Sequence, residues 1–153
     1  MSVEDVFETL DCWLSASWPL TREEVYARAT GRLGWSVNAD GYLENTRAGL
    51  SQPGVPVGEV SNPLRIATVN FWTTDVIRDG GDEAEAFLAD HYTLLVDEGI
   101  RRWGKPRRKR RGPNLSAMWE PGGARVTIAR SERSVTCDFV EPSYVQVLHT
   151  LGE

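Results

Sequence analysis

The sequence predicts an α+β domain in which helices pack on one face of a mostly antiparallel sheet. Three observations support this fold class: apolar residues at helical spacing in 3–15, 22–33 and 82–104, short β-like runs between 35 and 77, and a meander of three such runs over 115–140. Runs joined by short turns favour antiparallel neighbours, and helices grouped apart from strands are typical of this class. The length of 153 residues fits one domain, so we expect residues 1–153 to fold as a single unit.

Two helices are predicted at the start of the chain. In 3–15, apolar residues recur at helical spacing and acids occupy the other side. Thr21 and Glu24 have the spacing of a capping box, so a second helix should begin at Arg22. Gly34 is its expected end, because glycine readily adopts the left-handed conformation of a C-cap.

Short strands should follow the second helix. The candidates are 35–38, 41–46, 55–60 and 64–77, and Gly, Pro, Asn and Asp residues separate them. In the last of these, both sets of alternating positions contain apolar residues. This mixed pattern predicts a central strand rather than an edge strand.

The longest predicted helix spans 82–104 and should end at Gly104 and Pro106. Its apolar stripe is expected to face the core. The residues of that stripe are Ala84, Phe87, Leu88, His91, Tyr92, Leu95 and Ile100.

The C-terminal third should form two consecutive hairpins followed by a short helix. The expected strands are Leu115–Glu120, Ala124–Arg130 and Ser134–Val140, and short turns join them. The helix should begin at Ser143. The residues expected to pack it back onto the domain are Val147, Leu148 and Leu151.

Charge is distributed unevenly along the chain. The net charge is −5, but residues 101–111 contain eight bases and no acid, which leaves nine bases against 22 acids elsewhere, a net charge of −13. The candidate anion or nucleic-acid contacts are Arg101, Arg102, Trp103, Lys105, Arg107, Arg108, Lys109, Arg110 and Arg111. Guanidinium groups beside an aromatic ring suit phosphate contacts and base stacking. The alternatives are an ordinary solvated loop, an acidic protein partner, or folding back onto acids of the same chain.

Acids at helical spacing give two candidate protein-binding faces. One consists of Glu83, Asp90 and Asp97, and the other of Glu4, Glu8 and Asp11. Such a face would steer a basic partner towards the protein. The same acids are equally typical of solvated helix surfaces.

Sequence motifs for catalysis or metal binding are missing. There is no GxSxG, CxxC or phosphate-binding loop, and Cys12 and Cys137 are far apart and expected to be buried thiols. We therefore expect no catalytic residues, metal or cofactor, and no enzymatic activity. The first residues include acids where a signal peptide has bases, and no apolar run approaches the roughly 18 residues of a membrane span. A cytoplasmic location without membrane contact is expected.

Several short segments carry a resemblance to a known group of proteins. The segments are Trp18-Pro19-Leu20-Thr21, Leu33-Gly34-Trp35, Trp103-Gly104-Lys105-Pro106 and Trp119. Their arrangement resembles an uncharacterised family of small Trp-rich actinobacterial proteins, some of which look like immunity partners of secreted polymorphic toxins. The resemblance implies a structural likeness and a partner protein, and transfers no catalytic residue.

Three functional hypotheses follow. The first is a non-enzymatic immunity protein that binds and occludes a cognate toxin through an acidic surface. The second is a nucleic-acid-binding protein that uses residues 101–111, with Trp103 stacking on bases. The third is a secretion chaperone that clamps an extended substrate on exposed apolar surface.

Overall fold

The computed structural model describes residues 1–61 and 63–153 and confirms the α+β class. Six strands form one antiparallel sheet in the order β3-β4-β8-β7-β6-β5. They are β3 (Val57–Val60), β4 (Arg65–Trp72), β5 (Arg107–Arg111), β6 (Asn114–Trp119), β7 (Arg125–Arg130) and β8 (Val135–Val140). A separate two-stranded sheet consists of β1 (Ser36–Val37) and β2 (Leu43–Glu44).

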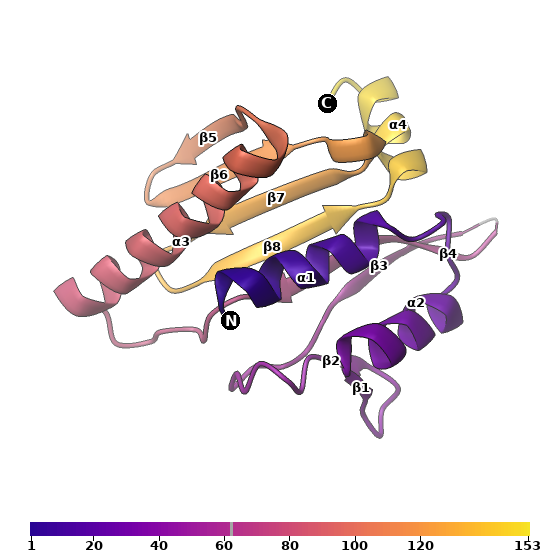
Figure 1. Cartoon of the computed structure of the whole chain (residues 1–153), viewed down its shortest axis with the longest axis horizontal. Helices are drawn as coiled ribbons and strands as arrows, with labels where there is room; N and C mark the ends of the chain where they lie inside the picture. Colours follow the sequence, from indigo (N-terminus) through magenta and orange to yellow (C-terminus); the bar gives the residue numbers. More distant parts are fainter. Residues whose placement is uncertain (62) are drawn as a thin grey trace.

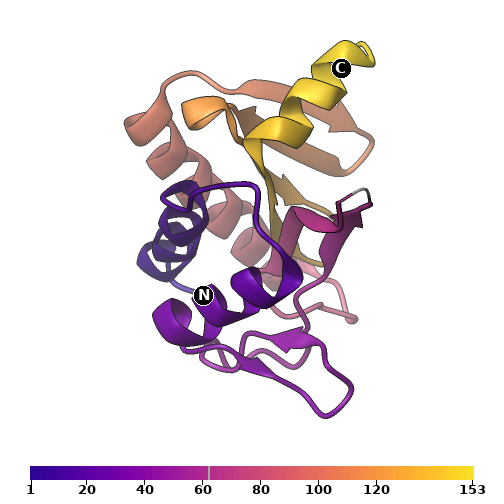
Figure 2. The ribbon, with the colours of Figure 1, turned by 90° about the vertical axis from the view of Figure 1, so that its right-hand side faces the viewer.

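Helices α1 (Val3–Leu14) and α3 (Asp82–Trp103) cover one face of the six-stranded sheet (Figure 1). The other helices are α2 (Arg22–Arg28) and α4 (Pro142–Thr150), together with the π-helical segment η1 (Ala29–Leu33), which continues α2, and the short 3₁₀ turn η2 (Pro121–Gly123). Helices α1 and α3 lie side by side over the strands (Figure 1), and a view turned by 90° shows both on the same side of the sheet (Figure 2). Helix α4 follows β8 at one end of the sheet. The predicted helix-on-sheet arrangement is therefore confirmed.

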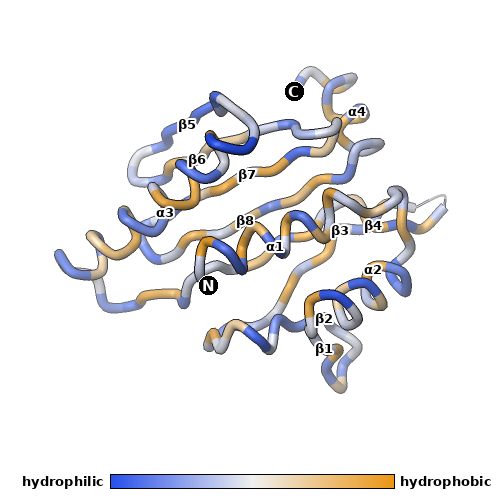
Figure 3. The backbone as a smooth tube through the Cα atoms, viewed as in Figure 1, coloured by the Kyte–Doolittle hydropathy of each residue, from blue (hydrophilic) through white to orange (hydrophobic). Residues whose placement is uncertain are grey.

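The core lies between the sheet and the helices α1 and α3. Phe71, Cys137, Ile128 and Ala117 are paired across β4, β8, β7 and β6 and are fully buried, so they form one continuous row on the covered face. The tube coloured by hydropathy shows apolar stretches along these inner strands, whereas β5 is hydrophilic throughout (Figure 3). Neighbouring residues in a strand point to opposite faces, so the alternate positions form a second face, which we call the open face.

Helix α3 approaches the sheet closely at Gly99. A Cβ atom added there would lie 2.6 Å from Cη2 of Trp119, inside the contact distance of two carbon atoms. Glycine at this position thus lets the buried indole of Trp119 pack against the helix backbone. The Trp119 Nε1–H donates to the backbone oxygen of Gly104 at 2.8 Å, which fixes the point where α3 ends.

Most predicted elements form within a few residues of their expected bounds. Thr21 and Glu24 make the predicted capping box, and Gly34 ends η1 with a φ of 66°. Strand β4 lies between β3 and β8, as its mixed pattern predicted, but it ends at Trp72 and not at residue 77. Strands β6, β7 and β8 form the expected meander. Cys12 and Cys137 are buried free thiols.

The predicted apolar stripe of α3 was partly wrong. Phe87 and Ile100 are exposed, and the buried residues of the helix are Leu88, Tyr92, Leu95, Val96 and Gly99. Positions 88, 92, 95, 96 and 99 share one side of a helix at spacings of three and four residues, and Phe87 lies at its margin. The buried side of α3 is therefore rotated about the helix axis relative to the predicted apolar stripe.

The prediction for the last helix was also wrong in part. Val145 is its fully buried residue, whereas Val147 and Leu151 are 42% and 74% exposed. Leu148 is half-buried, because it lies three residues after Val145 and shares its side of the helix. Val147 and Leu151 are four residues apart and share a different side, which faces solvent.

Residues 105–111 do not form the loop expected from their charge. Arg107–Arg111 are β5, the edge strand of the main sheet, and each pairs with a residue of β6 from Met118 back to Asn114. Arginine side chains are tolerated at an edge because they can stay in solvent on both faces. The short turn at Gly112, with a φ of 56°, lets β5 and β6 pair directly as a hairpin.

Candidate binding surfaces

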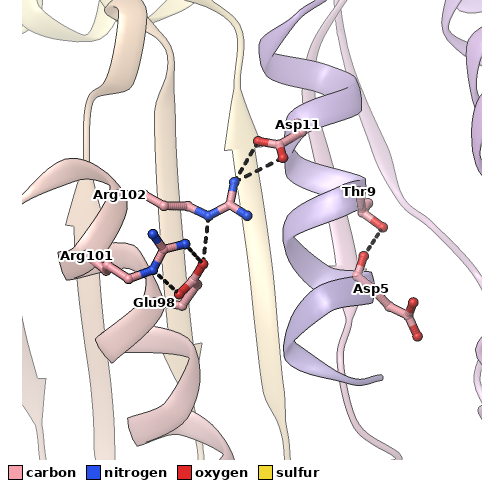
Figure 4. Close-up of polar contacts among 6 residues, drawn as sticks. All are labelled: Asp5, Thr9, Asp11, Glu98, Arg101 and Arg102. Carbon is pink, nitrogen blue, oxygen red and sulfur yellow. Dashed lines mark hydrogen bonds and ion pairs between the residues drawn. The ribbon is translucent and has the colours of Figure 1, made fainter.

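The basic run is divided by Gly104 into two parts with different surroundings. Arg101 and Arg102 belong to the last turn of α3 and both donate to the carboxylate of Glu98, with Nε–Oε distances of 2.8 Å and 3.0 Å (Figure 4). Arg102 also donates through Nη1 to Asp11 of α1 at 3.0 Å, and its guanidinium group lies 4.7 Å from the ring centroid of Phe7. These two arginines thus join α1 to α3.

This cluster stabilises the ionised form of Glu98. Hydrogen bonds from Arg101 and Arg102 lower the pKa of Glu98 to about 2. The carboxylate therefore stays ionised throughout the physiological range. Asp11, one of the acids proposed for partner binding, is already paired in this cluster.

Trp103 does not stand in solvent beside the bases. Its half-buried ring lies between Phe7 and Trp119, with centroids 5.6 Å away in each case. Trp103 also lines a surface hollow of about 480 Å³ together with Lys105 and Arg107. This packing leaves Trp103 less free to stack on a base than a fully exposed ring, because Phe7 and Trp119 both contact it.

The bases of β5 have different surroundings from Arg101 and Arg102. All five residues of Arg107–Arg111 are exposed, and within residues 1–61 and 63–153 none of them forms an ion pair. Lys109 pairs with Ser116, and that row continues to Ala129 and Thr136 on the open face. Because strand residues alternate, three bases point to this face and two to the helix side. We call this group the basic edge strand.

A surface hollow lies on the open face next to the basic edge strand. It measures about 500 Å³ and is bordered by Lys109 and Arg111. Its floor includes Ser116, Ala129 and Thr136, which are small side chains on three neighbouring strands. A row of small residues behind two cations leaves room for a polar or anionic group of a partner.

Acids gather on the solvent side of the two long helices. Five predicted residues are exposed and form no ion pair with the residues that the structure describes; they are Glu4, Glu8, Glu83, Asp90 and Asp97. Because α1 and α3 lie side by side, these acids share one layer of the molecule (Figure 1). We call them the acidic helical face.

Two large apolar residues that the sequence did not mark as exposed lie within this face. Phe87 and Leu94 are 53% and 56% exposed. Phe87, Asp90, Leu94 and Asp97 follow one another at spacings of three, four and three residues and so form a single stripe along α3. Such alternation of apolar and acidic residues is visible in the sequence, but the predicted apolar stripe places Phe87 in the core.

His91 forms a hydrogen bond with Thr73 rather than with an acidic residue. Its Nε2 lies 3.1 Å from the Thr73 hydroxyl, which itself donates to the backbone oxygen of Val135 at 2.8 Å and must therefore accept from His91. Burial lowers the pKa of His91, so the ring is neutral at physiological pH. Its sequence neighbour Asp90 is exposed on the acidic helical face.

One carboxyl group on the open face has an unusual pKa. Burial raises the pKa of Asp138 to about 6, although a hydrogen bond from Asn70 and the charge of Arg125 act in the opposite direction. Asn70 and Asp138 are directly paired between β4 and β8. The centre of the open face is thus less hydrated than its edge at β5.

The fold and these surfaces define an α+β domain with two oppositely charged regions, one on the helices and one at the sheet edge. Residues 4–141 match the model of a family of unknown function, DUF6301, and the chain belongs to that family. No curated protein and no solved structure matches the chain. None of the described helices is long and apolar enough to cross a membrane, and the described residues contain no group of three or more metal-ligating side chains.

Proposed function

We propose that this chain is a non-enzymatic protein-binding module whose acidic helical face covers a basic surface of another protein. The partner we propose is a secreted toxin domain, which would make the chain an immunity protein in the cytoplasm. Enzymes that act on nucleic acid have basic clefts because they must hold phosphates. An acidic surface placed over such a cleft blocks the substrate and associates rapidly.

The observation that carries the proposal is the stripe of Phe87, Asp90, Leu94 and Asp97 on α3. Protein interfaces place large apolar side chains at the centre and charged side chains around them. Phe87 and Leu94 are more than half exposed although both are large and apolar. Burial of these two side chains by a partner would supply affinity, while the acids of α1 and α3 would supply the rate and the selectivity of association.

The test searches the neighbouring genes for a large secreted protein with a separate C-terminal domain, and uses that domain as the candidate partner. We expect the chain to form a stable complex with that domain and to abolish its toxicity in co-expression. The triple variant Glu83→Lys, Asp90→Lys and Asp97→Lys should lower the association rate about ten-fold at low salt. The double variant Phe87→Ser and Leu94→Ser should mainly raise the dissociation rate.

A matched control separates the proposed face from net charge. The variant Glu23→Lys, Asp40→Lys and Glu132→Lys makes the same charge change at exposed sites outside the acidic helical face. It should leave both rates close to those of the unchanged chain. Equal effects of the two triple variants would contradict the proposal, as would a complex whose formation neither triple variant alters.

A further inference from the structure

The second inference concerns the basic edge strand and is independent of the acidic helical face. Strand β5 is at the end of the strand order and pairs with β6 alone among the described strands. Every second residue of an edge strand directs its backbone N–H and C=O groups away from the sheet. These groups can accept a further strand.

The two edges of the sheet are built differently. At the β3 edge the register shifts between Gly58 and Glu59, and Glu59 forms an ion pair with Arg22 of α2. A bulge and a neighbouring helix both hinder the addition of another strand. The β5 edge has five consecutive pairs in regular register and no shift. It is therefore the better template for strand addition.

The charges of β5 determine which strand can be added. Side chains directly opposite each other in neighbouring strands lie roughly 4.5–5.5 Å apart, so like charges repel and opposite charges attract. A second copy of β5 would place base against base along the whole strand. An acidic strand would instead place carboxylates beside Arg and Lys side chains on both faces of the sheet.

Protection against aggregation accounts for only part of this pattern. A single lysine on an edge strand is a common means of blocking unwanted pairing. Here all five residues are bases, and four of them are arginines, which bind carboxylates in a bidentate manner. The hollow of about 500 Å³ beside Lys109 and Arg111 adds a place for a side chain of the added strand.

We propose that β5 binds an extended acidic segment of another polypeptide, which adds to the sheet as a seventh strand. Backbone hydrogen bonds along β5 provide the pairing, and carboxylates of the segment contact Arg107, Lys109 and Arg111 on the open face and Arg108 and Arg110 on the helix side.

Nucleic acid fits this edge less well than an acidic peptide. Five strand residues span roughly 17 Å, which is about half a helical turn of duplex DNA. A duplex would extend past β5 over a body that, without the five bases of β5, has a net charge of −10. Single strands usually stack on exposed aromatic rings, whereas Trp103 and Trp119 contact each other and Trp119 is buried. A narrow acidic strand avoids both problems.

The experiment uses the full chain and a short synthetic peptide that alternates Glu with Thr or Val. Binding is followed by fluorescence anisotropy, and hydrogen exchange of the β5 amides is followed by NMR. We expect saturable binding and slower exchange at alternate β5 residues, because the outward amides become hydrogen-bonded. A peptide of the same sequence with N-methylated alternate amides should bind at least about ten-fold more weakly, since it cannot complete the strand ladder.

Two variants locate the site. The change Arg107→Glu, Lys109→Glu and Arg111→Glu should abolish peptide binding. The control change Arg32→Glu, Arg78→Glu and Arg133→Glu alters the same charge at exposed positions away from β5 and should leave most of the binding intact. Thermal unfolding of both variants confirms that they remain folded.

Three results would overturn the proposal. The first is equal binding of the N-methylated peptide, which would mean attraction by charge alone. The second is equal loss of binding in the two variants. The third is tighter binding of an oligothymidylate than of the peptide without protection of β5 amides, which would assign the edge to nucleic acid instead.

Discussion

The two parts of the basic run, residues 101–103 in α3 and residues 107–111 in β5, have similar composition but contrasting surroundings. Arg101 and Arg102 are paired with Glu98 and Asp11, and Trp103 packs between two aromatic rings. The bases of β5 are exposed and unpaired within the described parts of the chain. A run of basic residues in a sequence can therefore include residues that join two helices and residues that stay exposed. Here the end of α3 separates the two groups.

The largest expected effect tests the structural part. Trp103→Ala removes a ring packed against Phe7 and Trp119 and leaves space between α1 and α3, so it should lower the free energy of unfolding by about 3 kcal/mol. Urea unfolding followed by circular dichroism measures the change. The neighbouring substitution Lys105→Ala, at an exposed position, is the control and should have little effect. If the Trp103→Ala protein were as stable as the unsubstituted protein, Trp103 would resemble residues 107–111 in having no role in the packing of the helices.

The next largest effect concerns Asp138, a half-buried carboxyl group on the open face, in contrast to the exposed bases of β5. The folded protein binds the Asp138 proton more tightly than the unfolded chain, because burial raises its pKa from 3.8 to about 6. Its contribution to stability is therefore complete below pH 4 and is lost as the pH rises through 6. The lost contribution amounts to about 2–3 kcal/mol.

The variant Asp138→Asn checks this pH dependence. Above pH 7 it should be more stable than the unchanged protein, and the difference should shrink towards pH 4. Asp97→Asn, at an exposed position on α3, removes the same charge from the surface and is the matched control. A stability difference that does not vary with pH would show that Asp138 titrates normally.

A smaller effect is expected for the ion pair that joins the two helices. Arg102→Gln and Asp11→Asn, made singly and together, give a coupling energy by a double-mutant cycle. Asp11 is 56% exposed in this pair, so solvent should limit the coupling to about 0.5–1 kcal/mol. High salt should reduce it further. A coupling near zero would leave the aromatic contacts alone to join α1 and α3.

The smallest effect on stability is expected in β5 itself. Replacing Arg107, Lys109 and Arg111 by Gln should change the free energy of unfolding by no more than about 0.5 kcal/mol per residue, because these side chains form no ion pair in the described structure. Chemical unfolding at neutral pH measures this. A much larger loss would mean that the bases hold the sheet edge in place and are not reserved for a partner.

The fold could be predicted from sequence where the local signals were redundant. Capping residues, glycines at helix ends and the spacing of apolar residues located α1, α2, β4 and the β6–β8 meander. The strand at β5 could not be found in this way, because five bases carry no alternation of polarity, and only the pairing partner Asn114–Trp119 defines it. Strand propensity at an edge depends on the neighbouring strand more than on the residues themselves.

The candidate surfaces were predictable in composition but not in extent. The exposed acids were expected, whereas the pairing of Asp11 with Arg102 joins two residues that are 91 positions apart in the sequence and lie on different helices. The pairing of Glu98 with Arg101 and Arg102, by contrast, follows from spacings of three and four residues in one helix and was readable in advance. Phe87 was misplaced because a residue at the margin of an apolar stripe can face either side.

The approach of Gly99 to Trp119 has a consequence for comparing members of the family. A methyl group at 99 would overlap the indole, so the presence of the large ring requires the smallest residue opposite it. Members that retain tryptophan at 119 should therefore retain glycine at 99, while members with a smaller residue at 119 should tolerate alanine or serine at 99. Joint variation of these two positions offers a way to judge, from sequences alone, whether a distant member keeps the same spacing between its long helix and its sheet.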